Sequence, residues 1–223
     1  MFRRYRCLFL DHDDTAVDST ATIHYPAHLE VMSRMRPSTD PVSLEEWLSK
    51  NFHPGIMEYL REELGLSDEE IVEEGQIWRD YARKRTAPFF DGVLPLLRRF
   101  QDQGGYVVVV SHSHVDLIER DYRVGGEGIL PDLIYGWEYE ECCRKPSPFP
   151  VVDALRRLPV SPDESLVVDD LRPGVEMAKA AGVDVVAAGW GHRIPEIEEY
   201  MRANCIRYFT TVQELDQYLF SDL

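Results

Sequence analysis

The sequence lacks any long apolar run, and no stretch of its 223 residues approaches the roughly 20 apolar residues of a membrane-spanning helix. It has only four cysteines, Cys7, Cys142, Cys143 and Cys205, and their spacing matches neither a CxxC pair nor a zinc site. Basic residues are also scarce, with 24 Lys and Arg against 40 Asp and Glu and a formal net charge of −16. We therefore expect a cytoplasmic protein that binds no membrane and no nucleic acid, whose phosphates this charge would repel.

The sequence is otherwise typical of a globular protein, with 44% hydrophobic and 29% charged residues. A chain of 223 residues is long enough for one substantial core and a smaller second lobe. Between residues 21 and 86, apolar residues recur at helical spacing, and Ser67 with Glu70 matches a capping box. The helices predicted in this segment are 26–35, 43–51, 54–64 and 67–85.

From residue 88 onward, helical segments alternate with short β-branched runs, as in a parallel sheet flanked by helices. The predicted strands are 7–10, 106–110, 133–135, 166–168, 183–187 and 206–209, and the helices around them are 92–103, 117–123, 148–157, 174–181, 194–202 and 212–219. We therefore predict an α/β fold with a doubly wound, mainly parallel sheet and a small all-α cap domain inserted after the first strand. The core domain is expected to comprise residues 1–18 and 88–223, and the helical cap domain residues 19–87.

Three of the predicted strands end in polar residues. These are Asp11, Asp13 and Asp14 after 7–10, Ser111 after 106–110, and Asp169 and Asp170 after 166–168. Because ligands of doubly wound sheets lie beyond the carboxyl ends of the strands, we expect these side chains to converge. Crowded carboxylates repel one another unless a cation or a shared proton offsets them, and Mg²⁺ prefers such oxygen ligands. The alternative is that the aspartates cap helices or form acidic turns.

Four motifs include these positions. The first reads Asp11-His12-Asp13-Asp14-Thr15, the second is the strand-ending Ser111, the third is Lys145 in Arg-Lys-Pro-Ser-Pro, and the fourth is Asp169-Asp170 with the helix behind it. Together they resemble the four motifs of the haloacid dehalogenase (HAD) superfamily of hydrolases, in the phosphatase branch with a helical cap of the phosphoglycolate phosphatase type. The resemblance covers residues 5–19 and 88–193, and the cap matches in position and helical character.

The resemblance implies a Mg²⁺-dependent phosphatase that hydrolyses a small phosphorylated metabolite through an aspartyl-phosphate intermediate. Asp11 would be the nucleophile, and Asp13 would be the general acid and base. The side chains of Asp11 and Asp170 and the backbone carbonyl of Asp13 would hold the metal. Asp169 would be a further metal ligand or would hold a metal-bound water.

The resemblance also implies a phosphate-binding set made of Ser111, the backbone amide of His112, and Lys145. His12 stands where an apolar residue is usual and is expected to pack against the cap or the core. Gly174 lies one helical turn beyond the fourth motif, where many relatives carry an acidic residue.

In enzymes of this family the core domain binds only the phosphate group of the substrate. The resemblance therefore implies that the cap domain determines substrate specificity. Lys50, Asn51 and His53 lie at a helix end before a predicted turn and are the candidate specificity residues. Arg34 is expected to be solvated.

Two alternatives remain open. A sugar phosphomutase of the β-phosphoglucomutase type would need the cap to hold a second phosphate, and no clear Arg/Lys cluster in the sequence does so. A non-catalytic phosphate-binding regulatory protein is the alternative from another class, and the intact set of Asp11, Asp13, Lys145 and Asp170 argues against it. For all of these interpretations, the phosphatase included, we expect a monomer or a weak homodimer.

Overall fold

The structure is a computed structural model that describes residues 4–220. Contacts divide the chain into two compact units. The α/β unit runs to Asp18 and resumes at Pro88, and the helical unit is Ser19–Ala87. No helix among the described residues has both the length and the apolar character that crossing a bilayer requires.

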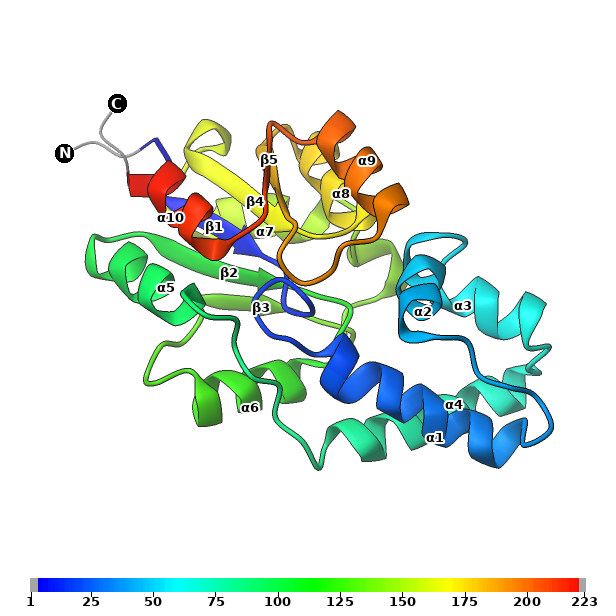
Figure 1. The fold of residues 1–223 in the computed structure, drawn as a ribbon. Helices are drawn as coiled ribbons and strands as arrows, with labels where there is room; N and C mark the ends of the chain where they lie inside the picture. Colours follow the sequence, from blue (N-terminus) through cyan, green and yellow to red (C-terminus); the bar gives the residue numbers. More distant parts are fainter. Residues whose placement is uncertain (1–3, 221–223) are drawn as a thin grey trace. The chain divides into compact units, whose positions relative to one another are not determined.

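The α/β unit contains a six-stranded sheet in the order β3-β2-β1-β4-β5-β6, and every neighbouring pair is parallel (Figure 1). The strands are β1 (Cys7–Leu10), β2 (Tyr106–Val110), β3 (Leu133–Tyr135), β4 (Ser165–Asp169), β5 (Asp184–Ala188) and β6 (Arg207–Phe209). β1 is central because the chain adds β2 and β3 on one side of it, and β4, β5 and β6 on the other. The predicted doubly wound α/β fold is confirmed, and each strand lies within one residue of its predicted bounds.

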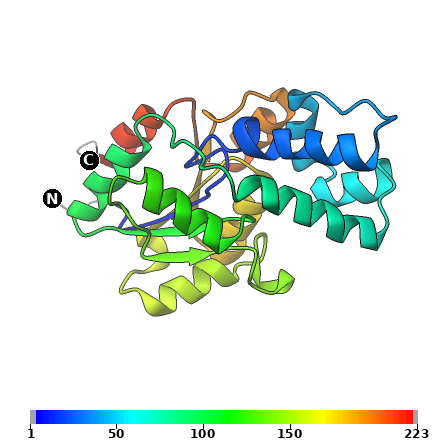
Figure 2. The same ribbon diagram turned by 90° about the horizontal axis from the view of Figure 1, so that it is seen from below.

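Helices cover both faces of the sheet. They are α5 (Val93–Asp102), α6 (Val115–Gly125), α7 (Phe149–Arg157), α8 (Arg172–Ala181), α9 (Pro195–Asn204) and α10 (Val212–Phe220). Figures 1 and 2 show α5, α6 and α10 on one face, and α7, α8 and α9 on the other. Right-handed connections explain the division of α5 to α9, because the sheet grows in opposite directions before and after α7.

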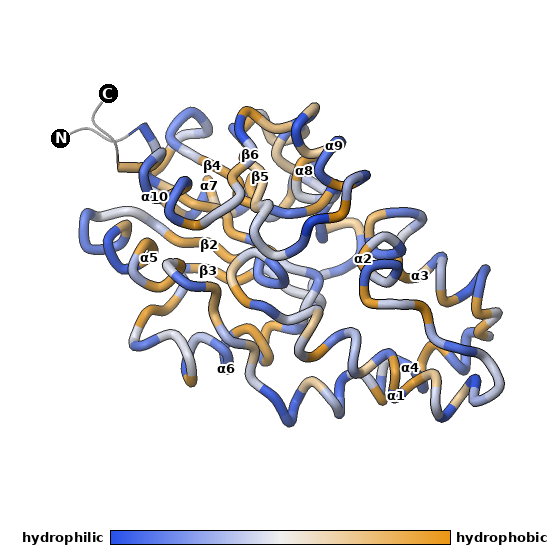
Figure 3. The backbone as a smooth tube through the Cα atoms, viewed as in Figure 1, coloured by the Kyte–Doolittle hydropathy of each residue, from blue (hydrophilic) through white to orange (hydrophobic). Residues whose placement is uncertain are grey.

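The central strands carry continuous runs of hydrophobic residues, which Figure 3 shows for β2 and for the middle of β4. Residues Val107 to Val110 and Leu166 to Val168 are buried. Strands covered on both faces must be apolar at successive positions, which explains why their sequences show no polar alternation. Polar residues therefore appear where these strands end.

The helical unit is built from α1 (Tyr25–Met35), α2 (Leu44–Phe52), α3 (Ile56–Glu58) and α4 (Asp68–Ala82), with π-helical turns at Thr20–His24 and Tyr59–Glu63. Trp47, Tyr59, Leu60 and Leu66 form its buried apolar cluster. The predicted capping box is confirmed, because the Ser67 amide donates to Glu70 and the Glu70 amide donates to the Ser67 hydroxyl. The helix predicted at 67–85 ends three residues early, at Ala82.

Candidate active site

The polar strand ends lie side by side because β2, β1 and β4 are neighbours in the sheet. Leu10 pairs with Val109 on one side and with Val168 on the other, so the three strands end at nearly the same level. The Asp11 amide extends this ladder by donating to the Val168 carbonyl at 3.0 Å. The first side chain after β1 therefore emerges beside the last residue of β4, Asp169.

Three carboxylates are crowded at this edge. Asp11, Asp169 and Asp170 each offer an oxygen within 4.8 Å of the others, and their exposed fractions are 6%, 1% and 2%. Burial raises the pKa of Asp11, and the charges of Asp169 and Asp170 raise it further, against the opposing charge of Lys145. Burial and the neighbouring charge of Asp169 likewise raise the pKa of Asp170. One ammonium group therefore faces three crowded carboxyl groups, and burial with mutual proximity disfavours full ionisation of Asp11 and Asp170.

Lys145 is the cation of this cluster. Its Nζ lies 2.7 Å from Asp11 Oδ1 and 2.8 Å from Asp169 Oδ2. Burial disfavours the charged ammonium, but the two carboxylates outweigh it and raise the pKa of Lys145. Arg144, the residue before Lys145, is itself held in place. Its guanidinium lies 3.9 Å from the Trp137 ring centroid and donates to the Tyr139 carbonyl.

The side chain of His112 forms a hydrogen bond with the backbone of Lys145. The Nε2 atom of His112 donates to the Lys145 carbonyl at 2.8 Å, and burial lowers the pKa of this imidazole. Within residues 4–220, the backbone N–H of His112 donates to no protein acceptor. The amide that the family resemblance implies for phosphate binding therefore has no competing bond in the described chain.

Asp13 is held by two hydroxyls. Its Oδ2 accepts from Ser111 Oγ at 3.0 Å and from Ser113 Oγ at 2.6 Å, and the Ser113 amide donates to Ser111 Oγ. Ser111 was among the predicted site residues and Ser113 was not, although the Ser-x-Ser spacing after a predicted strand is a visible signal. Two hydroxyl donors fix the orientation of the Asp13 carboxylate at the mouth of the site.

Asp169 and Asp170 take different partners. Asp169 accepts from the Leu171 amide at 3.0 Å in addition to Lys145. A Cβ at Gly174 would overlap the Asp169 carboxylate. The glycine at this position is therefore explained by the Asp169 side chain, which fills the space that a side chain on α8 would need.

Asp170 is bonded at both oxygens. Thr15 Oγ1 donates to Oδ1 at 3.3 Å, and His192 Nε2 lies 2.9 Å from Oδ2. Burial lowers the pKa of His192, against the charge of Asp14. His192 was not among the predicted site residues, because a single polar residue in the loop after β5 has no motif around it.

The other histidines near the first two motifs have separate partners. His12 Nε2 lies 3.2 Å from Asp121 Oδ2 on α6, and the ring of His12 is 2% exposed. His12 therefore packs inside the α/β unit, which is one of its two expected positions. His114 Nδ1 lies 2.8 Å from Glu138 Oε1.

The candidate specificity residues already make contacts within the helical unit. Lys50 Nζ lies 2.7 Å from Glu63 and 5.6 Å from the centroid of the Tyr59 ring. Asn51 donates to the Trp47 carbonyl one helical turn before it. His53 follows α2 and is exposed.

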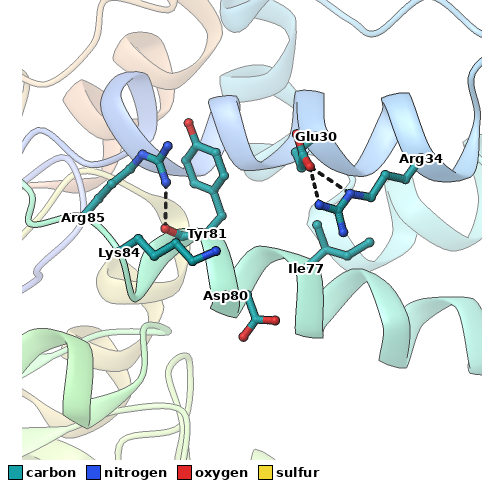
Figure 4. Close-up of a pocket in the computed structure, with 7 residues that line it drawn as sticks. All are labelled: Glu30, Arg34, Ile77, Asp80, Tyr81, Lys84 and Arg85. Atoms are coloured by element: carbon teal, nitrogen blue, oxygen red, sulfur yellow. Dashed lines mark hydrogen bonds and ion pairs between the residues drawn. The ribbon is translucent and has the colours of Figure 1, made fainter.

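The helical unit also contains a cavity of about 310 Å³ between α1 and α4 (Figure 4). Its polar lining includes the basic residues Arg34, Lys84 and Arg85 and the acidic residues Glu30 and Asp80. Arg34 is paired with Glu30, and Arg85 lies 3.4 Å from the Tyr81 ring centroid and donates to the Tyr81 carbonyl. The basic cluster that the sequence did not reveal is therefore partly neutralised by its neighbours.

Comparisons with known proteins agree with the predicted family. The family model of the haloacid dehalogenase-like hydrolases matches residues 5–182. A phosphoglycolate phosphatase of Xanthomonas campestris is 26% identical over 199 residues, which are 85% of each chain.

Two solved structures share the fold. A haloacid dehalogenase-like protein of unknown function from Agrobacterium tumefaciens has a TM-score of 0.76 and 20% identity, over 96% of this chain and 97% of that one. A HAD family hydrolase from Deinococcus radiodurans, which holds bound phosphate and sodium, has a TM-score of 0.72 and 19% identity, over 98% and 96%. The predicted membership is confirmed: this chain belongs to the haloacid dehalogenase-like hydrolases, in their phosphoglycolate phosphatase-like branch.

Proposed function

We propose that the protein is a Mg²⁺-dependent phosphatase that hydrolyses a small phosphorylated metabolite through an aspartyl phosphate on Asp11. The observation that carries this proposal is the buried cluster of Asp11, Asp169 and Asp170 around Lys145. A nucleophilic carboxylate beside one fixed cation and further carboxylates suits attack on a phosphate dianion, whose charge must be offset.

The donor set fits a magnesium ion. Mg²⁺ prefers hard oxygen ligands. The pKa values of Asp11 and Asp170 are raised first by burial and then by the charges of neighbouring carboxylates, and a divalent cation would offset those charges. The side chains of Asp11 and Asp170 and the carbonyl of Asp13 would hold the ion. Asp169, which is bonded to Lys145 and to the Leu171 amide, would chiefly hold the lysine. When bound, Mg²⁺ would screen the charge of the phosphate and polarise it.

The side chains around the cluster have separate roles in this mechanism. Asp11 would attack phosphorus and form the covalent intermediate. Lys145 would donate to the phosphate oxygens while it keeps Asp11 in place. Asp13, oriented by Ser111 and Ser113, would protonate the leaving alkoxide and then take a proton from the water that attacks the intermediate.

The first substrate to test is 2-phosphoglycolate. The support for this choice is the name of the Xanthomonas relative, which aligns with 85% of this chain. The proposed specificity residues Lys50, Asn51 and His53 would contribute through the cap. A panel of small phosphorylated metabolites extends the test beyond this one compound.

A sugar phosphomutase is the second candidate, and one observation favours it. Arg34, Lys84 and Arg85 line one cavity of the helical unit, as a site for a second phosphate would require. Glu30 neutralises Arg34, however, so this cavity offers less positive charge than its basic residues suggest. Isomerised sugar phosphate with little free phosphate would identify a mutase, whereas stoichiometric free phosphate identifies the phosphatase.

Release of p-nitrophenol from p-nitrophenyl phosphate tests the proposal directly. We expect turnover that depends on added Mg²⁺ and disappears with EDTA. Asp11→Asn should abolish turnover and leave the fold intact by circular dichroism. Asp184→Asn is the matched control, because Asp184 accepts from Tyr5 at the amino end of the sheet and should be dispensable for turnover. Metal-independent turnover, or full activity of Asp11→Asn, would contradict the mechanism, and absence of any turnover would favour the regulatory alternative.

A further inference from the structure

The loop after β5 is fixed against the first motif. A Cβ at Gly191 would overlap the backbone carbonyl of Asp14, so only glycine permits this close approach. Trp190 Nε1 donates to the Thr15 carbonyl at 2.9 Å. Two independent contacts therefore hold the residue that follows, His192, in place beside the strand ends.

His192 forms a buried hydrogen bond with Asp170. Its Nε2 lies 2.9 Å from Asp170 Oδ2, and the two side chains are 5% and 2% exposed. Because a carboxylate oxygen accepts, Nε2 is the nitrogen that donates. Thr15 Oγ1 donates to the other oxygen, so the carboxylate is restrained at both ends.

We propose that His192 is a positioning residue that fixes the Asp170 carboxylate in the orientation needed to hold a divalent cation. This inference rests on the proposed function, in which Asp170 is a metal ligand. Hydrogen bonds from outer residues orient metal-ligating carboxylates, and their loss typically costs about 10–100-fold in metal affinity or activity. Helix α8 does not supply such a donor from position 174, because a side chain there would overlap Asp169.

The test compares three variants of the full chain. His192→Leu removes the donor at similar volume, and His192→Gln keeps an N–H donor. Tyr5→Phe is the matched control, because it removes a 2.6 Å bond to the Asp184 carboxylate at the amino end of the sheet. Isothermal titration with Mg²⁺ alone gives the Kd of each, and thermal unfolding in EDTA confirms that each variant folds.

We expect the Mg²⁺ Kd to rise about 10–100-fold in His192→Leu and to stay within about threefold of wild type in His192→Gln and Tyr5→Phe. The Mg²⁺ concentration that gives half-maximal phosphatase activity should shift in parallel, while the substrate KM at saturating Mg²⁺ stays nearly constant. A wild-type Kd in His192→Leu would overturn the positioning role, and so would an equal rise in Tyr5→Phe. Wild-type protein that turns over substrate without binding Mg²⁺ would instead overturn the metal assignment on which both proposals depend.

Discussion

Replacing His28 by phenylalanine tests whether a buried neutral imidazole makes the helical unit sensitive to acid. His28 lies on α1, is 1% exposed, and stacks on Trp47 with ring centroids 4.0 Å apart. The rings of Tyr25 and Tyr59 flank it, and within residues 4–220 neither of its ring nitrogens has a hydrogen-bond partner. Burial lowers the pKa of His28 from 6.5 to about 4. Phenylalanine keeps the aromatic contact and removes the titration.

The magnitude follows from proton linkage. Because the pKa of His28 is lower in the folded state than in the unfolded state, the unfolded chain binds more protons below pH 6.5, and stability falls until about pH 4. At pH 5 the unfolded imidazole is almost fully protonated, whereas about a tenth of the folded imidazole is. Summed from pH 8 down to pH 5, the difference in protons bound by the two states lowers the free energy of unfolding by about 2 kcal/mol. Wild type should lose this amount between pH 8 and pH 5, and His28→Phe should retain it.

Urea unfolding at the two pH values, followed by tryptophan fluorescence, measures the difference. Trp47 reports on the region directly because it stacks on His28. His53→Phe, which changes an exposed histidine of the same unit, is the control and should show the pH dependence of wild type. If His28→Phe and wild type lost equal stability between pH 8 and pH 5, the reasoning from burial would be refuted.

Three further predictions concern the site. Ser113→Ala removes the 2.6 Å hydrogen bond to Asp13. The kcat/KM for p-nitrophenyl phosphate should fall about 10-fold, as expected for one hydrogen bond to a charged group. Unchanged kinetics would show that Ser111 alone is enough to orient Asp13. Gly174→Ala overlaps the neighbouring Asp169 carboxylate and should cost about 1–3 kcal/mol in urea unfolding, whereas Gly75→Ala, into open space on α4, should not destabilise. Lys145→Met leaves two buried carboxylates without their cation. It should lower the free energy of unfolding by about 3–5 kcal/mol in EDTA and by less in saturating Mg²⁺. An equal loss of stability in both conditions would contradict the charge argument.

Local pattern was enough to predict most of the architecture. The apolar run from Cys7 to Leu10 is β1 at its predicted bounds, and the capping box at Ser67 begins α4 as expected. Strands buried on both faces and amphipathic helices each have a characteristic periodicity, which a short window of sequence reveals. Helix ends were less accurate, as at Ala82, because the last turn of a helix depends on capping contacts that the periodicity does not encode.

The sequence by itself determined the fold class, the family, and the crowding of aspartates after the first strand. These properties reside in contiguous motifs and in the periodicity of single elements. Only the tertiary structure decided that Ser113 bonds to Asp13, that Asp169 occupies the space above Gly174, and that His192 bonds to Asp170. The physical reason is that β1, β2, β4 and the loop after β5 meet through sheet order, and hydrogen bonds between distant segments leave no periodic trace in the chain.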